Sequence, residues 1–135
     1  MRKALVVTLI GLSTLALSQP VKADSNRSYR LAYQLISGSR TAYLRNEEFR
    51  EYTLKWLEQD KGHPHKFAMS YCQSKRSGFS DSKINDRTMK QLLARQSREG
   101  WSESRTTAYG LIQVTGYTVG LHYYCPEFID KDINQ

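Results

Sequence analysis

The sequence predicts an all-α fold, a small single-domain bundle of four to five helices stapled by one disulfide. Three observations support this prediction. Apolar residues recur at the i, i+3, i+4, i+7 spacing of amphipathic helices along most of the chain. Glycine and proline residues separate these periodic segments. The only two cysteines, Cys72 and Cys125, fall in two different predicted helices.

Residues 1–23 have the three parts of a secretory signal peptide. A basic start at Arg2 and Lys3 precedes the apolar run 4–17, and the small-residue stretch Val21–Ala23 forms a cleavage site. A membrane anchor is the alternative, but crossing a bilayer takes roughly 20 apolar residues and this run is shorter. We therefore expect a secreted or periplasmic protein that keeps no transmembrane segment after cleavage.

Residues 24–135 then form a single secreted helical domain, long enough to build one hydrophobic core. The formal net charge of +7 includes three cations of the signal peptide, so the cleaved chain is only modestly basic. Because the chain also has no nucleic-acid-reading motif, we do not expect nucleic acid as a partner. We expect Asp24–Arg27 to be a loose terminus.

The first predicted helix follows apolar residues that share one face, and a Ser-Gly-Ser turn closes it at Gly38. These apolar residues are Tyr29, Ala32, Tyr33 and Ile36.

The second helix begins after Asn46, which is a favourable N-cap. Its apolar stripe is Phe49, Tyr52 and Trp56. We expect Gly62 to end the segment in the left-handed conformation.

The third predicted helix starts at Pro64, because proline is well tolerated in a first helical turn. Its apolar stripe places Cys72 on the buried face, and Gly78 follows its end. Ser80 or Asp81 caps the fourth helix, which buries Ile84, Thr88 and Leu92, runs to about Arg95 and is broken by Gly100.

The last segment, from about Arg105 to Tyr124, is the most apolar and has two interpretations. Its β-branched and aromatic residues favour a strand, but strict alternation is absent and the apolar spacing is helical, so we predict a helix. Gly116 and Gly120 lie four residues apart and would allow another helix to approach closely. Pro126 ends the segment before a loose tail, 128–135.

The two cysteines have three interpretations: a disulfide, a reactive nucleophile or a metal pair. Export into an oxidising compartment favours the disulfide. A nucleophile needs a histidine and a carboxylate close by, and a structural metal usually needs four ligands. The histidines His63, His65 and His122 show no such spacing. A Cys72–Cys125 bridge closes a long loop and is worth about 4 kcal/mol of stability.

A combination of motifs resembles a family of small secreted bacterial proteins, common among mycobacteria, known as domain-of-unknown-function family 732. The matching positions are Cys72, Gly78, Ser80, Tyr124, Cys125 and Pro126. They cover roughly half of the chain after cleavage. This chain is richer in Tyr, Arg and Lys than the Ala-rich members, and its segment before Phe67 is longer. The resemblance implies a secreted all-α domain with one disulfide and implies no activity.

No residue pattern indicates an enzyme, a cofactor or a resident metal, and we predict no catalytic residue. The pair Glu47 and Glu48 diverges by about 100° on a helix, which suits a charged first turn better than a glycosidase dyad. His63 and His65 flank a proline, and two ligands in a loop seldom hold a metal alone. We expect most of the nine tyrosines to supply core volume, with Tyr117, Tyr123 and Tyr124 as a candidate cluster that lines a pocket or an interface.

The cations of the fourth helix are the strongest candidates for a binding surface. Lys83, Arg87 and Lys90 share one face, and Arg95 continues it. Such a face suits an anionic envelope component or an acidic protein partner, although a solvated helix surface has the same pattern. The leading hypothesis is non-enzymatic binding of a protein or anionic envelope component. The alternatives are a small hydrolase that pairs His122 or His63 with a carboxylate, and a passive structural or stress-related envelope protein.

Overall fold

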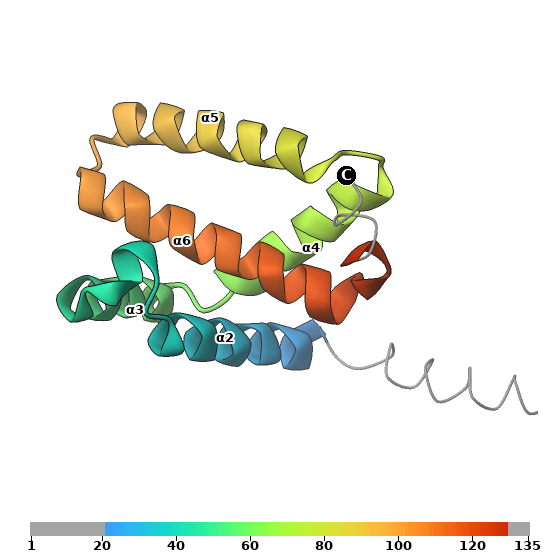
Figure 1. The fold of residues 1–135 in the computed structure, drawn as a ribbon, viewed down its shortest axis with the longest axis horizontal. Helices are drawn as coiled ribbons and strands as arrows, with labels where there is room; N and C mark the ends of the chain where they lie inside the picture. Colours follow the sequence, from blue (N-terminus) through green and yellow to red (C-terminus); the bar gives the residue numbers. More distant parts are fainter. Residues whose placement is uncertain (1–20, 130–135) are drawn as a thin grey trace, which may run out of the picture.

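The computed structural model describes residues 21–129 and confirms the predicted all-α bundle with one disulfide. Its helices are α2 (Val21–Gly38), α3 (Glu47–Gln59), α4 (His63–Arg76), α5 (Asp81–Glu99) and α6 (Glu103–Val119) (Figure 1). Three short elements complete the fold: the 3-10 helices η1 (Ala42–Arg45) and η3 (Pro126–Phe128), and η2 (Gly120–Tyr124), one turn of π-helix. The strand interpretation of the last segment is therefore wrong.

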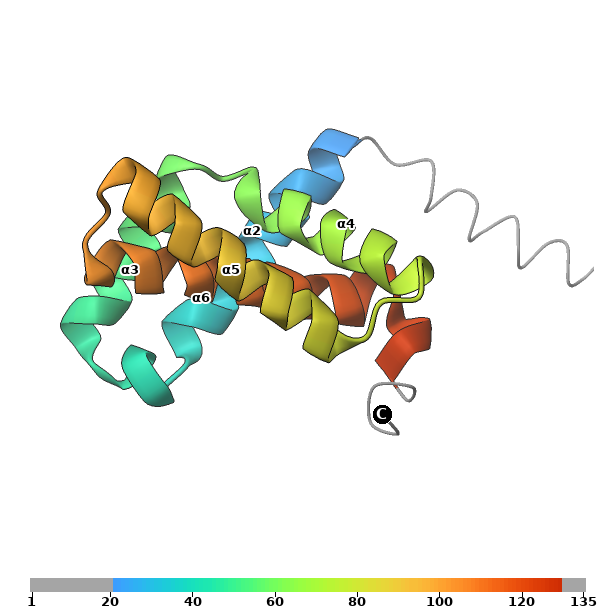
Figure 2. The ribbon, with the colours of Figure 1, turned by 90° about the horizontal axis from the view of Figure 1, so that it is seen from above.

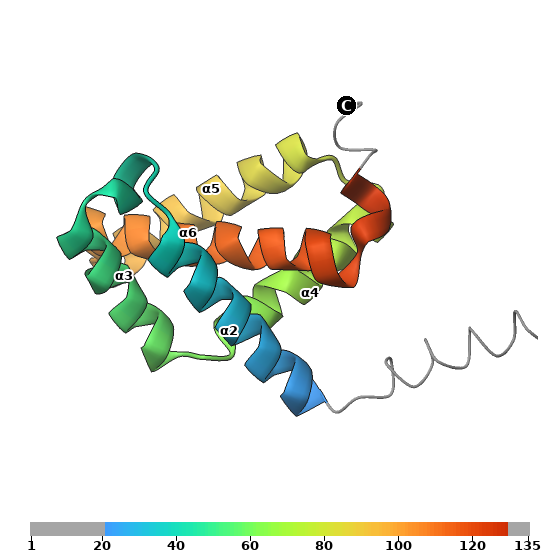
Figure 3. The ribbon, with the colours of Figure 1, turned by 60° about the horizontal axis from the view of Figure 1, so that its bottom comes forward.

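Helix α6 is the centre of the bundle and contacts each of the other four α-helices. Helix α5 runs along one side of α6, and α2 and α3 lie on the other side (Figure 1). Seen from above, α5 lies over α6 with α4 beside it (Figure 2), and from below α2 crosses α6 (Figure 3). One apolar cluster joins α2, α3, α4 and α6, and includes Ala32, Ile36, Leu57, Phe67 and Ile112.

Three helices begin at side-chain caps, and the sequence predicts two of these, Asn46 and Ser80. Asn46 accepts a hydrogen bond from the Phe49 amide at 2.8 Å, and Ser80 and Ser102 cap α5 and α6 in the same way. Gly100 ends α5 in the left-handed conformation, with φ 68°. The prediction for Gly62 is wrong: it has right-handed backbone angles and precedes α4 as its N-cap.

Helix α2 begins earlier than predicted, because Asp24–Arg27 are helical rather than loose. The reason is Ser28, which is fully buried one helical turn before Ala32 and continues the stripe of Ala32 and Ile36. Its hydroxyl lies 2.7 Å from the Tyr124 hydroxyl and 3.3 Å from Nδ1 of His65. A polar residue inside an apolar stripe hid this part of the helix from a hydrophobic pattern. The predicted signal peptide and tail lie mostly outside the described residues.

The α4–α6 contact is a close approach of two backbones, as the glycine spacing predicts. A Cβ added at Gly116 would lie 2.6 Å from Cβ of Phe67, and one added at Gly120 would lie 2.7 Å from the carbonyl oxygen of Ala68. At the end of this contact Cys72 and Cys125 form the predicted disulfide, with an S–S distance of 2.09 Å. Both cysteines are fully buried.

Candidate functional site

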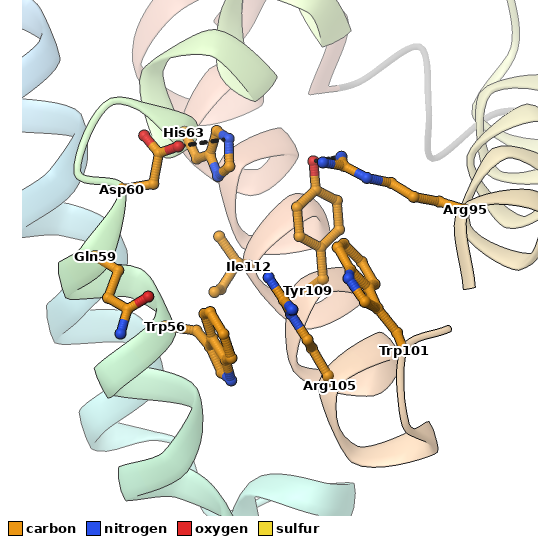
Figure 4. A pocket seen from close by; sticks show the side chains of 9 residues that line it. All are labelled: Trp56, Gln59, Asp60, His63, Arg95, Trp101, Arg105, Tyr109 and Ile112. Carbon is orange, nitrogen blue, oxygen red and sulfur yellow. Dashed lines mark hydrogen bonds and ion pairs between the residues drawn. The ribbon is translucent and has the colours of Figure 1, made fainter. Parts of the chain in front are cut away.

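A pocket of about 250 Å³ lies where the end of α3, the start of α4, the end of α5 and the first half of α6 meet (Figure 4). Two indoles, a phenol, two guanidinium groups and an imidazole line it, beside one carboxylate. The lining residues are Trp56, Gln59, Asp60, His63, Arg95, Trp101, Arg105, Tyr109 and Ile112. We call this site the arginine–tryptophan pocket.

Local helix geometry brings these residues to one place. Arg105, Tyr109 and Ile112 are spaced i, i+4, i+7, so α6 presents them on one face. The left-handed turn at Gly100 reverses the chain and places the Trp101 ring 5.2 Å from the Tyr109 ring. Trp56 comes from the predicted apolar stripe of α3.

Arg105 is held between the two tryptophans. Its guanidinium carbon lies 4.0 Å from the ring centre of Trp56 and 4.4 Å from that of Trp101, which is a cation–π sandwich. Among residues 21–129, this guanidinium has neither an ion pair nor a hydrogen bond to a protein acceptor. Figure 4 shows the side chain reaching from α6 into the pocket between the two indoles. The sandwich fixes the planar group, and its N–H donors remain available to a ligand.

Arg95, in contrast, is already engaged with protein groups. It donates to the Tyr109 hydroxyl at 2.9 Å and to a Glu99 carboxylate oxygen at 3.0 Å. Burial raises the pKa of the Tyr109 phenol, and the charge and hydrogen bond of Arg95 only partly oppose this. The phenol therefore stays protonated at neutral pH and is not an anionic nucleophile.

His63 and Asp60 form the third polar part of the pocket. Nε2 of His63 lies 2.9 Å from a carboxylate oxygen of Asp60, and the ring packs on Phe67 and Tyr109. Burial lowers the pKa of His63; Lys66 and Arg95 act in the same direction, while Asp60 opposes them. The ring is therefore neutral at neutral pH and donates its Nε2–H to Asp60, which leaves Nδ1 as an acceptor.

The structure separates the four cations that the sequence groups together. Lys83, Arg87 and Lys90 line one exposed groove on α5, with the Arg87 guanidinium 4.6 Å above the Phe79 ring. Arg95 does not continue this face and lies in the arginine–tryptophan pocket instead. Because an α-helix has 3.6 residues per turn, Arg95, eight residues after Arg87, points away from the face that the other three cations share.

The remaining candidates lie apart from one another. His65 is packed in the buried contact with Ser28 and Tyr124, and His122 is exposed in η2. The structure does not gather all three tyrosines: Tyr117 and Tyr124 pack against one apolar cluster around the disulfide, whereas Tyr123 is exposed beside Arg27. Within the described part of the chain, no three His, Cys, Asp or Glu side chains gather in a way that suits a metal ion.

Sequence reasoning did not find Trp56, Trp101 and Arg105 as a site, because they come from three segments. The one available signal was composition, since Trp56 and Trp101 are the only tryptophans of the chain.

Between residues 21 and 129, none of the helices has the length and apolarity that crossing a membrane requires. A comparison with protein-family models, curated proteins and solved structures gives no match.

Proposed function

We propose that this protein is a non-enzymatic binding domain that takes an anionic group of a protein or envelope component into the arginine–tryptophan pocket. The observation that carries the proposal is the Arg105 guanidinium. It is fixed between two indoles and has no hydrogen-bond or ion-pair partner in the described chain. A signal-like N-terminus and the Cys72–Cys125 disulfide support action in a secreted or periplasmic setting. The resemblance to family 732 stays a prediction.

The geometry favours a carboxylate or phosphate oxygen pair as the bound group. A guanidinium presents parallel N–H donors that match such groups in a two-point contact. Because the indoles already hold Arg105 in place, little side-chain freedom is lost on binding. Arg95 adds positive charge at the opposite wall, and Asp60 faces His63. A pocket of about 250 Å³ is smaller than usual drug-sized sites, so it suits one group of a larger molecule.

Isothermal titration calorimetry with inorganic phosphate and with benzoate tests this proposal on the disulfide-bonded protein. We expect Arg105→Ala to weaken binding by about tenfold or more, because a hydrogen bond to a charged group is lost. Arg105→Lys keeps the charge without the planar fork and should restore only part of the affinity. The matched control is Arg98→Ala, which removes one exposed cation outside the pocket.

Each result bears on the proposal. Equal loss in Arg98→Ala and Arg105→Ala would mean that only net charge matters, which contradicts a pocket. Absence of binding of either anion to the wild-type protein would also contradict it and would favour the passive structural alternative. Circular dichroism of each variant checks that the helices remain folded.

A second candidate function, hydrolysis, is favoured by one observation, the 2.9 Å contact between His63 and Asp60. A neutral imidazole oriented by a carboxylate is a suitable general base. Since the pocket lining includes no Ser, Thr or Cys, the nucleophile would be water. His122, the other histidine considered, is exposed and makes no ion pair with a described carboxylate.

Turnover of p-nitrophenyl acetate separates the two functions. The binding function predicts no difference in hydrolysis between wild type and His63→Gln. A rate above the buffer background that His63→Gln removes and His122→Gln retains would instead support the hydrolase.

A further inference from the structure

A second cavity lies between α4, α5 and α6, on the other side of Tyr109 from the arginine–tryptophan pocket. Its volume is about 260 Å³. Tyr109 lines both spaces, but the chemistry of the two differs. The second cavity is walled by uncharged hydroxyl, amide and aromatic groups, and its two cations, Lys66 and Arg87, are exposed at the rim. We call it the tyrosine cavity.

A chain of hydrogen bonds forms the inner wall of the tyrosine cavity. The amide nitrogen of Gln113 donates to the Tyr117 hydroxyl at 3.2 Å, and that hydroxyl lies 2.6 Å from Oγ1 of Thr88. Either of these two hydroxyls can donate to the other. Both Thr88 and Gln113 line the cavity.

Gln113 also carries an unused acceptor. Gln113 as a whole residue is only 9% exposed, but its amide oxygen is accessible to solvent and has no hydrogen-bond donor among residues 21–129. This acceptor can take a hydrogen bond from water or from a ligand in the cavity. On the facing helix, Ser70 and Ser74 are one turn apart and line the same cavity. Neither hydroxyl has a partner in that part of the chain.

Aromatic rings form the apolar part of the wall beside these polar groups. Tyr71 and Tyr117 stack with their ring centres 5.4 Å apart, and the Tyr117 ring meets Phe67 edge-on. A ligand in this cavity therefore meets aromatic rings and several neutral donors and acceptors at once. An apolar ligand would leave the Gln113 oxygen unsatisfied, and an anion would find cations only at the rim.

We propose that the tyrosine cavity is a second ligand site that takes one ring of a neutral saccharide. A sugar ring has C–H faces that pack on aromatic rings and hydroxyls that both donate and accept hydrogen bonds, which is the combination that the wall offers. The volume suits a single ring rather than a drug-sized ligand. This site is independent of the anionic group proposed for the arginine–tryptophan pocket, so either proposal stands if the other fails.

Nuclear magnetic resonance titration of the ¹⁵N-labelled, disulfide-bonded protein tests the site, with maltose, cellobiose and chitobiose as neutral probes. We expect at least one disaccharide to shift the amides of Ser70, Ser74, Thr88 and Gln113 in a saturable way. Ser74→Val removes a wall hydroxyl at a partly buried position and should weaken binding about fivefold, the effect of one neutral hydrogen bond. The matched control, Ser97→Val, lies on exposed α5 surface outside the cavity and should bind like wild type.

Arg105→Ala distinguishes the two sites, because it should remove anion binding and leave saccharide binding unchanged. Saturable shifts confined to the tyrosine cavity that survive Arg105→Ala support the proposal. No saturable shift with any of the three disaccharides would overturn it and leave the cavity as a solvent-filled space. Equal weakening by Ser74→Val and Ser97→Val, or shifts located elsewhere on the surface, would also overturn it.

Discussion

The two contacts that α6 makes with α4 and with α5 are built differently. Against α4, Gly116 and Gly120 bring the backbones together, and the buried disulfide closes the far end. Against α5, only Ile84, Thr88 and Leu92 are buried, and polar contacts such as Thr88 with Tyr117 provide much of the link. The first contact has no room for a ligand, whereas both proposed sites lie beside the second.

This difference shows how one small bundle separates stability from binding capacity. The α4–α6 contact buries backbone and sulfur tightly, and tight packing excludes ligands. The α5 side keeps polar side chains and unfilled space, which cost stability but are required to bind a polar ligand. Variants on the two sides should therefore have different consequences.

Removing the disulfide should have the largest effect on stability. The bridge closes a loop between positions 53 residues apart, so Cys72→Ala with Cys125→Ala should lower the free energy of unfolding by about 4 kcal/mol. Urea unfolding followed by circular dichroism measures this. Adding reductant to the wild-type protein should reproduce the loss, and a loss below about 1 kcal/mol would show that α4 and α6 hold together without the bridge.

Glycine-to-alanine variants compare the two contacts directly. Gly120→Ala places its Cβ against the backbone of Ala68, which cannot rotate away, and should cost about 1–3 kcal/mol. Gly110→Ala meets only the end of the Leu92 side chain, at 2.9 Å, which can rotate, so it should cost less. Gly38→Ala meets no atom within 4 Å and serves as the control. If Gly110→Ala were as costly as Gly120→Ala, the α5 contact would be as tight as the α4 contact.

The pH dependence of stability should reveal His63. Its folded-state pKa is lowered, mainly by burial, so the unfolded chain takes up a proton more readily than the folded chain. Stability is then fully retained above the ordinary histidine pKa of about 6.5 and falls as the pH drops from there towards the folded-state value. His63→Gln should reduce this slope, which urea unfolding at a series of pH values measures.

The affinity for an anion should depend on pH in the opposite direction from the stability. The groups that face the His63 ring are Asp60, Lys66, Arg95, Phe67 and Tyr109. A bound anion adds negative charge beside this ring, so binding should strengthen as the pH falls and His63 becomes protonated. Calorimetry of phosphate binding to wild type and His63→Gln, corrected for the titration of phosphate itself, measures this effect.

The exposed groove on α5 should have the smallest effect on stability. Replacing Lys83, Arg87 and Lys90 by glutamine should reduce sedimentation with phosphatidylserine vesicles at low salt, because each cation near an anionic surface contributes about 1 kcal/mol. The free energy of unfolding should change little. A control variant replaces three exposed cations elsewhere, Arg30, Lys55 and Arg98. Equal sedimentation of both variants and the wild type would identify the groove as an ordinary solvated surface.

Most of the helices could be predicted from sequence because their signals are local. Apolar spacing, the caps Asn46 and Ser80, and Gly100 each act within one or two turns. The start of α2 could not be predicted, because its buried contact is made by Ser28, and the partners of Ser28 lie far along the chain. Gly62 was misjudged because glycine tolerates both hands of backbone and the sequence does not say which one is used.

The candidate site was harder to predict than the helices. Arg95 was expected on the face of Lys83, but the helical repeat alone turns it off that face; its contact with Tyr109 depends on the packing of α5 on α6. Trp56, Trp101 and Arg105 belong to one pocket because a turn after α5 and a crossing of α3 and α6 bring them together. The disulfide, by contrast, needed only a count of cysteines and an expected compartment.

The cation–π sandwich around Arg105 also gives the protein an intrinsic fluorescent probe. Trp56 and Trp101 are the only tryptophans in the sequence, and both contact the same guanidinium. Emission excited selectively from the indoles therefore reports on this pocket and on no other part of the molecule. An anion that binds Arg105 should change that emission directly. A saccharide in the tyrosine cavity should leave it nearly constant, so a single unlabelled sample can distinguish occupancy of the two sites.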